Sequence, residues 1–401
     1  MSHFPGRGAL CQGDDVRGSA ERSAGSDGRE LLSVFRRGRI AGLLVLWKII
    51  FSASIMHFAT SGVMLANPDS LRYVFHRNPG IGSHAQIHPL SVILNMGYDI
   101  TQLDRYRKDI LTYPYAPAAS TVFGNLVRPA SLVREYGFWR FLRHEVLPLE
   151  FNTGASWWPN YQLHLIGGGA SWARLAEWFD ARGVSAPGWW AAGTVMAGHL
   201  LNEVMENNAV KGRLIDPIAD IYLFDLGGIA LFSSEDVRRF FGESLHLADW
   251  SLQPALLLSN GHVHNAGQYF SVRLGIPGSE RWSLLYVFGL NGLLGASVRL
   301  DNGDAISLAA GLRTKQLHAE TENPLRVTAD LTWSGGLYWD REGSLLASFV
   351  LSGISSNLLT ANVYPGVFRI GGISPGCFIT VTTEGRIFAG INSTWGIGAG
   401  W

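Results

Sequence analysis

Alternation of apolar and polar residues is the dominant pattern in the last third of the chain. Val327, Leu331, Trp333 and Trp339 share one parity with further apolar residues, while small or polar residues hold the other parity. Successive side chains of a strand point to opposite faces, so this period of two predicts strands with one apolar face. The pattern recurs over 262–401, where turn signals separate roughly eight strand-length segments.

The polar parity of these segments is mostly Ser, Thr, Gly and Asn, with few charges. Such residues suit the packed interior of a small barrel better than a surface that faces water. We therefore expect an antiparallel β-barrel of about eight strands, the smallest usual size in membranes; a soluble barrel is the alternative. The alternating segment Ile391 to Trp401 resembles the closing strand of bacterial outer-membrane barrels. That resemblance implies recognition of the Trp401 strand by a barrel-assembly machinery.

Helical patterns precede the strands and make the predicted fold class α+β. Residues 129–250 are predicted to form a helical domain, with helices from about Tyr161 to Arg182 and from Pro187 to Asn207. Residues 67–128 show a mixed, irregular pattern. The helix from Pro187 and the next expected helix, which Asp216 caps, are apolar almost all round, which is typical of helices buried in protein or lipid.

The N-terminal 66 residues are predicted to serve targeting. Residues 1–39 are polar and without apolar periodicity, so we expect disorder. An apolar run over 40–66 follows three arginines, which is the pattern of a signal peptide. Lys48 interrupts the run, so a retained membrane anchor and a buried soluble helix are the alternatives.

Composition narrows the class of protein. Lys+Arg and Asp+Glu are both 32, which argues against a dedicated nucleic-acid binder. Charged residues make up 16% of the chain, and 14 Trp and 48 Gly are present, a combination that favours a membrane β-protein. The 2 Cys exclude a disulfide framework.

Ionisable residues inside the apolar helices are the candidate functional groups. His199, Glu203 and Glu206 are spaced i, i+4 and i+7 and share one helix face, and Asp220 follows on the next helix. These four residues are the candidate catalytic set. The spacing matches no recognised metal signature, so we expect no cofactor and leave a metal open.

A polar network is the competing interpretation of the same residues, because buried ionisable groups must pair, neutralise or bind something. Its expected members are Asn160, His164, Arg174, Asn202 and Asp216. A site for a lipid headgroup or a small ligand, and a catalytic metal site of the kind found in helical bundles, are further alternatives.

Three motifs resemble a family of bacterial envelope domains of unknown function. They are WWPNYQLHLIGGG with Asn160 and His164, NEVMEN with Glu203 and Glu206, and DPIADIYLFDLGG with Asp216 and Asp220. The resemblance implies an exported protein, often tied to the outer membrane, without an agreed activity.

These observations together predict a protein of the outer membrane of a diderm bacterium, with the periplasmic side of a membrane as the alternative location. We expect a structural, lipid-organising or small-transport role, membrane lipid as a partner and no nucleic acid. The alternative function is a membrane-bound hydrolase of envelope lipid or glycan that uses the His, Glu and Asp residues. An enzyme is thus not excluded, although a non-enzymatic role is favoured.

Overall fold

The structure is a computed structural model that describes residues 73–151, 156–210, 213–319, 325–371, 373–394 and 396–401. The chain divides into two compact units, Met1–Ile55 and Met56–Trp401, and every described residue belongs to the second. The predictions for residues 1–39 and 40–66 lie outside the described residues.

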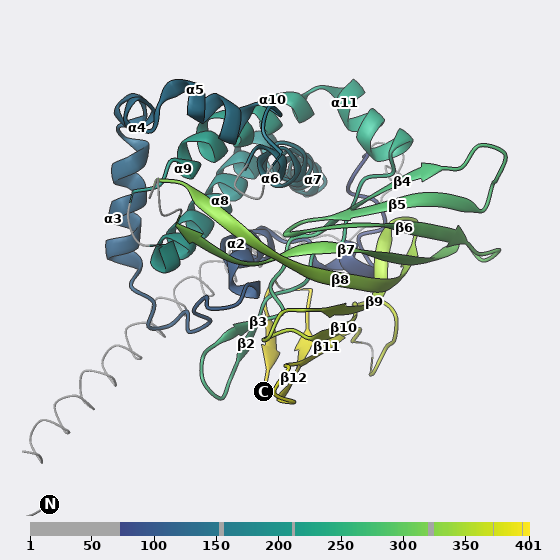
Figure 1. Ribbon diagram of the computed structural model, residues 1–401. Coiled ribbons are helices and arrows are strands. Elements are labelled where there is room, and N and C mark those ends of the chain that lie inside the picture. The colour runs from purple at the N-terminus through teal and green to yellow at the C-terminus, as the bar shows by residue number, and fades with distance from the viewer. Residues whose placement is uncertain (1–72, 152–155, 211–212, 320–324, 372, 395) are drawn as a thin grey trace, which may run out of the picture. The chain divides into compact units, whose positions relative to one another are not determined.

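Helices fill the first part of the described chain (Figure 1). In chain order they are η2 (Gly82–Gln86), α2 (Pro89–Gly97), η3 (Asp99–Gln102), α3 (Tyr115–Leu126), α4 (Pro129–Tyr136), α5 (Phe138–Phe141), η4 (Leu142–Val146), α6 (Trp157–Pro159), η5 (Asn160–Gly168), α7 (Gly169–Asp180), α8 (Pro187–Val210), α9 (Asp216–Ala219), η6 (Asp220–Asp225), α10 (Leu226–Ser233), α11 (Glu235–Arg239) and η7 (Phe240–Ser244). Segments η4, η5, η6 and η7 are π-helical, whereas η2 and η3 are 3₁₀ helices.

Strands follow the helices. They are β1 (Ala248–Asp249), β2 (Ala255–Leu257), β3 (Val263–His264), β4 (Phe270–Gly275), β5 (Trp282–Phe288), β6 (Asn291–Arg299), β7 (Asp304–Ala319), β8 (Val327–Arg341), β9 (Ser344–Ser352), β10 (Leu359–Val363), β11 (Gly376–Val381), β12 (Ile387–Asn392) and β13 (Gly398–Gly400). The α+β class is therefore confirmed.

The strands form one sheet of 13 strands in the described part of the chain, in the order β1-β4-β5-β6-β7-β8-β9-β10-β11-β12-β13-β2-β3. Neighbouring strands run antiparallel except β13 and β2, which run parallel. This sheet is not closed into a barrel, and the predicted number of eight strands is not confirmed. The sheet has more strands than predicted partly because several strands near its edges contain only two or three residues, too few to show alternation in the sequence.

One face of the sheet is apolar along its whole width. Two hydrogen-bond registers define this apolar face, and neither contains a charged or a buried residue. The first is Leu274, Leu284, Ala296, Leu308, Leu337, Phe349, Ala361, Ile379 and Ala389. The second is Trp282, Val298, Ile306, Trp339, Ala347, Val363, Cys377, Ile391 and Ala399.

The opposite face of the sheet is buried and carries both polar and apolar side chains, the latter including Leu285, Val287 and Leu293. The register between the two apolar ones contains Ser283, Ser297, Ser307, Tyr338, Ser348, Asn362, Phe378, Gly390 and Gly400. Segment η3 packs on this side, where Asp99 Oδ1 accepts the Gln268 amide N–H at 2.6 Å and Gln102 Oε1 accepts from Arg313 at 3.3 Å. The sheet thus has a filled inner side of mixed polarity and an apolar outer side.

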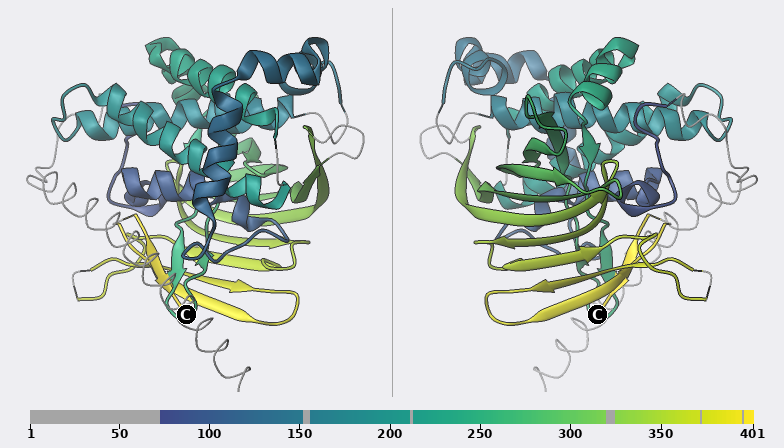
Figure 2. Two further views of the ribbon diagram at one scale, coloured as in Figure 1. Left: turned by 90° about the vertical axis from the view of Figure 1, so that its left-hand side faces the viewer. Right: turned by 90° about the vertical axis from the view of Figure 1, so that its right-hand side faces the viewer.

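The helical part packs near the end of the sheet that contains β4, and strands β10 to β13 lie toward the other end (Figure 2). A core of buried residues that includes Ala170 of α7, Phe232 of α10, Phe270 of β4 and Phe288 of β5 joins helices and strands. Across the described residues, no helix is by itself both long and apolar enough for a membrane span. One sharply bent pair, Asp216–Ser233 with Glu235–Ser244, meets the length and composition criterion together.

Candidate functional site

Three helical segments bring ionisable side chains together. Segment η5 carries His164, α8 carries His199, and η6 carries Asp220 and Asp225. Their backbones can approach closely because glycines stand at the crossing. A Cβ atom on Gly228 would lie 2.6 Å from the Leu165 carbonyl oxygen, a distance that real Cβ atoms do not show. Gly228 therefore allows α10 to pack closely against η5.

His164, His199 and Asp225 form the centre of the site, which we call the His–Asp centre. Asp225 Oδ1 lies 2.9 Å from His164 Nδ1 and 2.6 Å from His199 Nδ1, and the two imidazole rings are 4.6 Å apart. The His164 contact is a hydrogen bond, whereas His199 Nδ1 is not aligned as a donor to any acceptor. One ligand atom from each residue lies within 4.8 Å of the others, which is the arrangement of a metal-binding triad.

Five further carboxyl groups surround this centre and form what we call the acidic cluster: Glu145, Glu203, Glu206, Asp216 and Asp220. Burial, and then the charges of neighbouring acids, raise the pKa values of all these groups except that of Asp216, which burial alone raises. The pKa of Glu206 rises to about 8. Hydrogen bonds join Glu203 to Asp220 and Glu145 to Asp216, so each pair shares a proton or a cation.

Asp225 behaves differently from the acidic cluster. Burial by itself would raise its pKa, but the charges of His199 and His164 and the hydrogen bond to His164 outweigh burial and lower the pKa. An ionised Asp225 beside two imidazoles, with His164 Nε2 only 3.5 Å from Asp220 Oδ2, offers nitrogen and oxygen ligands for a divalent cation. The residues that would hold such an ion are His164, His199 and Asp225.

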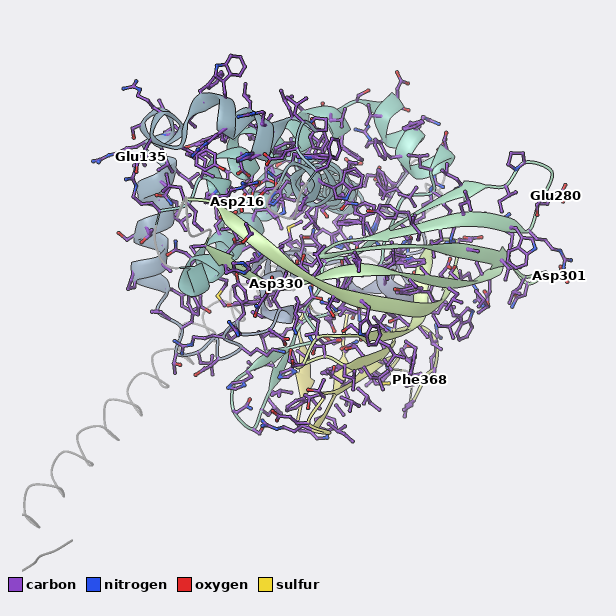
Figure 3. All side chains as sticks on the ribbon, in the orientation of Figure 1. Glu135, Asp216, Glu280, Asp301, Asp330 and Phe368 are labelled. Carbon is purple, nitrogen blue, oxygen red and sulfur yellow. The ribbon has the colours of Figure 1, made fainter. Side chains whose placement is uncertain are left out.

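The structure brings together most of the residues singled out from the sequence. His199, Glu203, Glu206, Asp220, His164 and Asp216 all lie in or beside the His–Asp centre, and Asp216 is labelled among the helices in Figure 3. Asn160 contacts the edge of the site, because its Nδ2 donates to the Glu145 carbonyl oxygen at 3.1 Å.

Two members of the expected network lie elsewhere. Arg174 forms an ion pair with Asp249 at 3.0 Å, and Asn202 donates to the Met96 carbonyl oxygen at 3.0 Å. Arg174 therefore does not neutralise the acidic cluster. The cation that acts on its edge is Arg326, which lowers the pKa of Glu145 against the stronger effect of burial.

Sequence reasoning missed Asp225 and Glu145. Asp225 stands five residues after Asp220, a spacing that places two side chains on different faces of an α-helix. Segment η6 is π-helical, with i→i+5 hydrogen bonds, and this brings residues five apart onto one side. Glu145 is equally buried in a second π-helical segment, η4. An acid pair five apart in an apolar run was the available signal.

Access to the His–Asp centre is restricted in the described part of the chain. Among the cavities of this part, those of about 570, 40 and 30 Å³ are not lined by His164, His199 or Asp225. The exposed fraction of the side chain is 14% for His164, 4% for His199 and zero for Asp225. The arrangement is therefore that of a closed centre between packed helices.

Comparisons with family models, with curated proteins and with solved structures found no match to this chain. The resemblance to a family of bacterial envelope domains therefore remains an expectation from the sequence.

Proposed function

We propose that this protein associates with a lipid bilayer through the apolar face of its sheet and has a structural or lipid-organising role in the cell envelope. The single observation that carries the proposal is the composition of the two registers of the apolar face. Eighteen residues across the sheet include no charge, and Leu308 is 66% exposed in the centre of the face. A sheet with one face in water carries polar residues on that face, and these two registers carry almost none.

Exposed aromatic residues support contact with a membrane. Trp282 is 50% exposed at the start of β5, directly after Arg281, which pairs with Asp301 at 2.6 Å. Glu280 and Asp301 lie at the far turns of the strands in Figure 3. Aromatic residues between an apolar band and a charged turn are typical of the border between lipid and water.

A short segment of the chain connects the two ends of the sheet. Strands β1 and β2 are separated by residues 250–254, which bond to both sides. The Trp250 and Leu252 amides donate to the Tyr269 and Gly267 carbonyls, and the Gly398 amide donates to Pro254. We propose that this segment ties the two ends of the open sheet together in lipid, in the outer membrane of a diderm bacterium. The inner cavity of about 40 Å³ favours an organising role over transport.

Charge placed in the apolar face tests the proposal. Leu308 and Leu337 are paired residues on the neighbouring strands β7 and β8. In the double variant Leu308→Lys with Leu337→Lys, each lysine should cost about 2–4 kcal/mol in a bilayer. We expect the double variant to be lost from liposomes in flotation. Asn302→Lys with Thr383→Lys adds the same charge at exposed turns and should float like the wild type.

A milder change separates lipid contact from folding. Leu308→Ser should keep the circular dichroism spectrum in detergent and still weaken association with liposomes. Full association of both the serine and the lysine variants would overturn the proposal.

A metal-dependent hydrolase of envelope lipid or glycan is the second candidate, and the convergence of His164, His199 and Asp225 favours it. Such an enzyme needs a metal and a coordination position that substrate can reach. Glu203→Gln with Glu206→Gln distinguishes the two roles. Retained folding and metal content with loss of lipid or glycan hydrolysis would support the enzyme, whereas loss of folded protein would support a structural centre.

A further inference from the structure

A large cavity opens between helix α7, strand β4 and the β8–β9 turn, away from the His–Asp centre. Its volume is about 570 Å³, within the range of small-molecule sites. Five arginines and three acidic residues line it, and Arg77, Arg273 and Arg281 pair with acids that do not line it, Glu243, Asp340 and Asp301. Arg299 is exposed at this cavity, whereas Arg174 is buried within it.

Two of these arginines retain unused hydrogen-bond donors among the described residues. Arg174 pairs with Asp249 through Nη1, but its Nε and Nη2 are buried and have no partner. Arg273 pairs with Asp340 through both Nη atoms, but its Nε is buried and has no partner. A buried donor without an acceptor costs roughly 1–3 kcal/mol, so an acceptor supplied by a ligand would remove this cost.

The neighbouring side chains fit an anion. Ser171 lies one helical turn before Arg174 on α7 and also lines the cavity. Burial, and then the charge of Arg174, hold the pKa of His84 well below its usual range. Burial lowers the pKa of His246 in the same way, followed by the charges of Arg273 and Arg299. In both cases burial is the larger cause, and the charges of the arginines add to it.

We propose that this cavity binds a phosphate-bearing ligand, with Arg174 and Arg273 as the buried donors and Arg299 as the entrance cation. The guanidinium group presents its N–H donors in a planar fork that matches the oxygens of a phosphate. The ligand is either a soluble phosphate ester or the headgroup of an anionic lipid, because both present the same group. This assignment does not depend on the lipid contact of the apolar face.

Binding measurements on the full chain in detergent test the assignment. The probes are glycerol 3-phosphate, dioctanoylphosphatidylglycerol and, as a probe without phosphate, dioctanoylglycerol. We expect binding of at least one phosphate probe and none of dioctanoylglycerol at this cavity. Binding of glycerol 3-phosphate identifies a soluble ester as sufficient, and binding of the lipid probe alone identifies a headgroup.

Substitutions in the cavity give the second part of the test. Arg174→Lys keeps the charge and removes the fork, and we expect binding about ten-fold weaker. Arg299→Gln changes an exposed residue and leaves the buried pairs intact, and we expect binding about three-fold weaker. Arg239→Gln, on the exposed surface of α11, should change nothing. Absence of binding by both phosphate probes, or unchanged binding in both cavity variants, would overturn the proposal.

Discussion

The apolar face of the sheet and the helical core around the His–Asp centre distribute polarity in opposite ways. The sheet exposes Leu308, Leu337 and Phe349, while the helices bury Asp220 and Asp225. In water, exposed apolar residues of the sheet would contribute no free energy of burial. The buried carboxylates of the helices are unfavourable unless they are paired or hydrogen-bonded. We propose that the sheet is adapted to a non-aqueous neighbour, and that the helices are adapted to a cation or to shared protons.

Removal of the central carboxylate should have the largest effect on the polar side of this comparison. Asp225→Ala leaves His164 and His199 without their common partner, and breaking a buried charged pair costs about 3–5 kcal/mol. We expect a loss of this order in the free energy of unfolding, measured with urea in detergent. Asp236→Ala, at an exposed position of α11, is the control and should change stability little. Equal stability of both variants would remove the distinction between the two regions.

Asp99, which lies against the inner side of the sheet, should make the stability of the protein depend on pH. Burial raises the pKa of Asp99 from its usual value of 3.8 to about 7. Between these pH values the folded state keeps a proton that the unfolded state has lost, so stability falls as pH rises, by at most about 1.4 kcal/mol per pH unit. Asp99→Asn keeps the oxygen that accepts from Gln268 and should flatten this slope. An unchanged slope in urea titrations from pH 4 to 7 would contradict the prediction.

Helix approach at the glycine crossing can be separated from helix propensity. Gly228→Ala places a methyl group against the Leu165 and His164 carbonyls, and we expect a loss of about 1–3 kcal/mol. Gly193 of α8 faces open space, so Gly193→Ala should stabilise the protein by roughly 0.5–1 kcal/mol. The two variants should thus change the melting temperature in opposite directions.

Removal of metal sharpens the comparison further and has the smallest structural effect. If a divalent cation occupies the His–Asp centre, chelation should lower the melting temperature of the wild type. His199→Gln should lack this response, because it removes one of the ligands that would hold the cation. Elemental analysis after loading with zinc or manganese gives an independent measurement. The same response in the wild type and in His199→Gln would argue against metal at this centre.

The strand pattern could be predicted from the sequence because it is local. Alternation in 327–339 requires only that successive side chains point to opposite faces, and the structure has a strand over Val327–Arg341. Within the helical domain predicted over 129–250, the first helix is interrupted at Gly137, whose φ of 100° ends α4 and allows α5 to begin in a new direction. A glycine between two apolar stripes was the signal that this position can break a helix.

The sequence by itself determined the α+β class, the apolar parity of the strands and the helix face shared by His199, Glu203 and Glu206. Each of these follows from the fixed period of an α-helix or a strand. Only the tertiary structure decided that Asp225 completes the His–Asp centre and that Arg174 lies at another cavity. It also decided how 13 strands are ordered in an open sheet. These outcomes depend on π-helical spacing and on contacts between residues far apart in the chain, which no local period encodes.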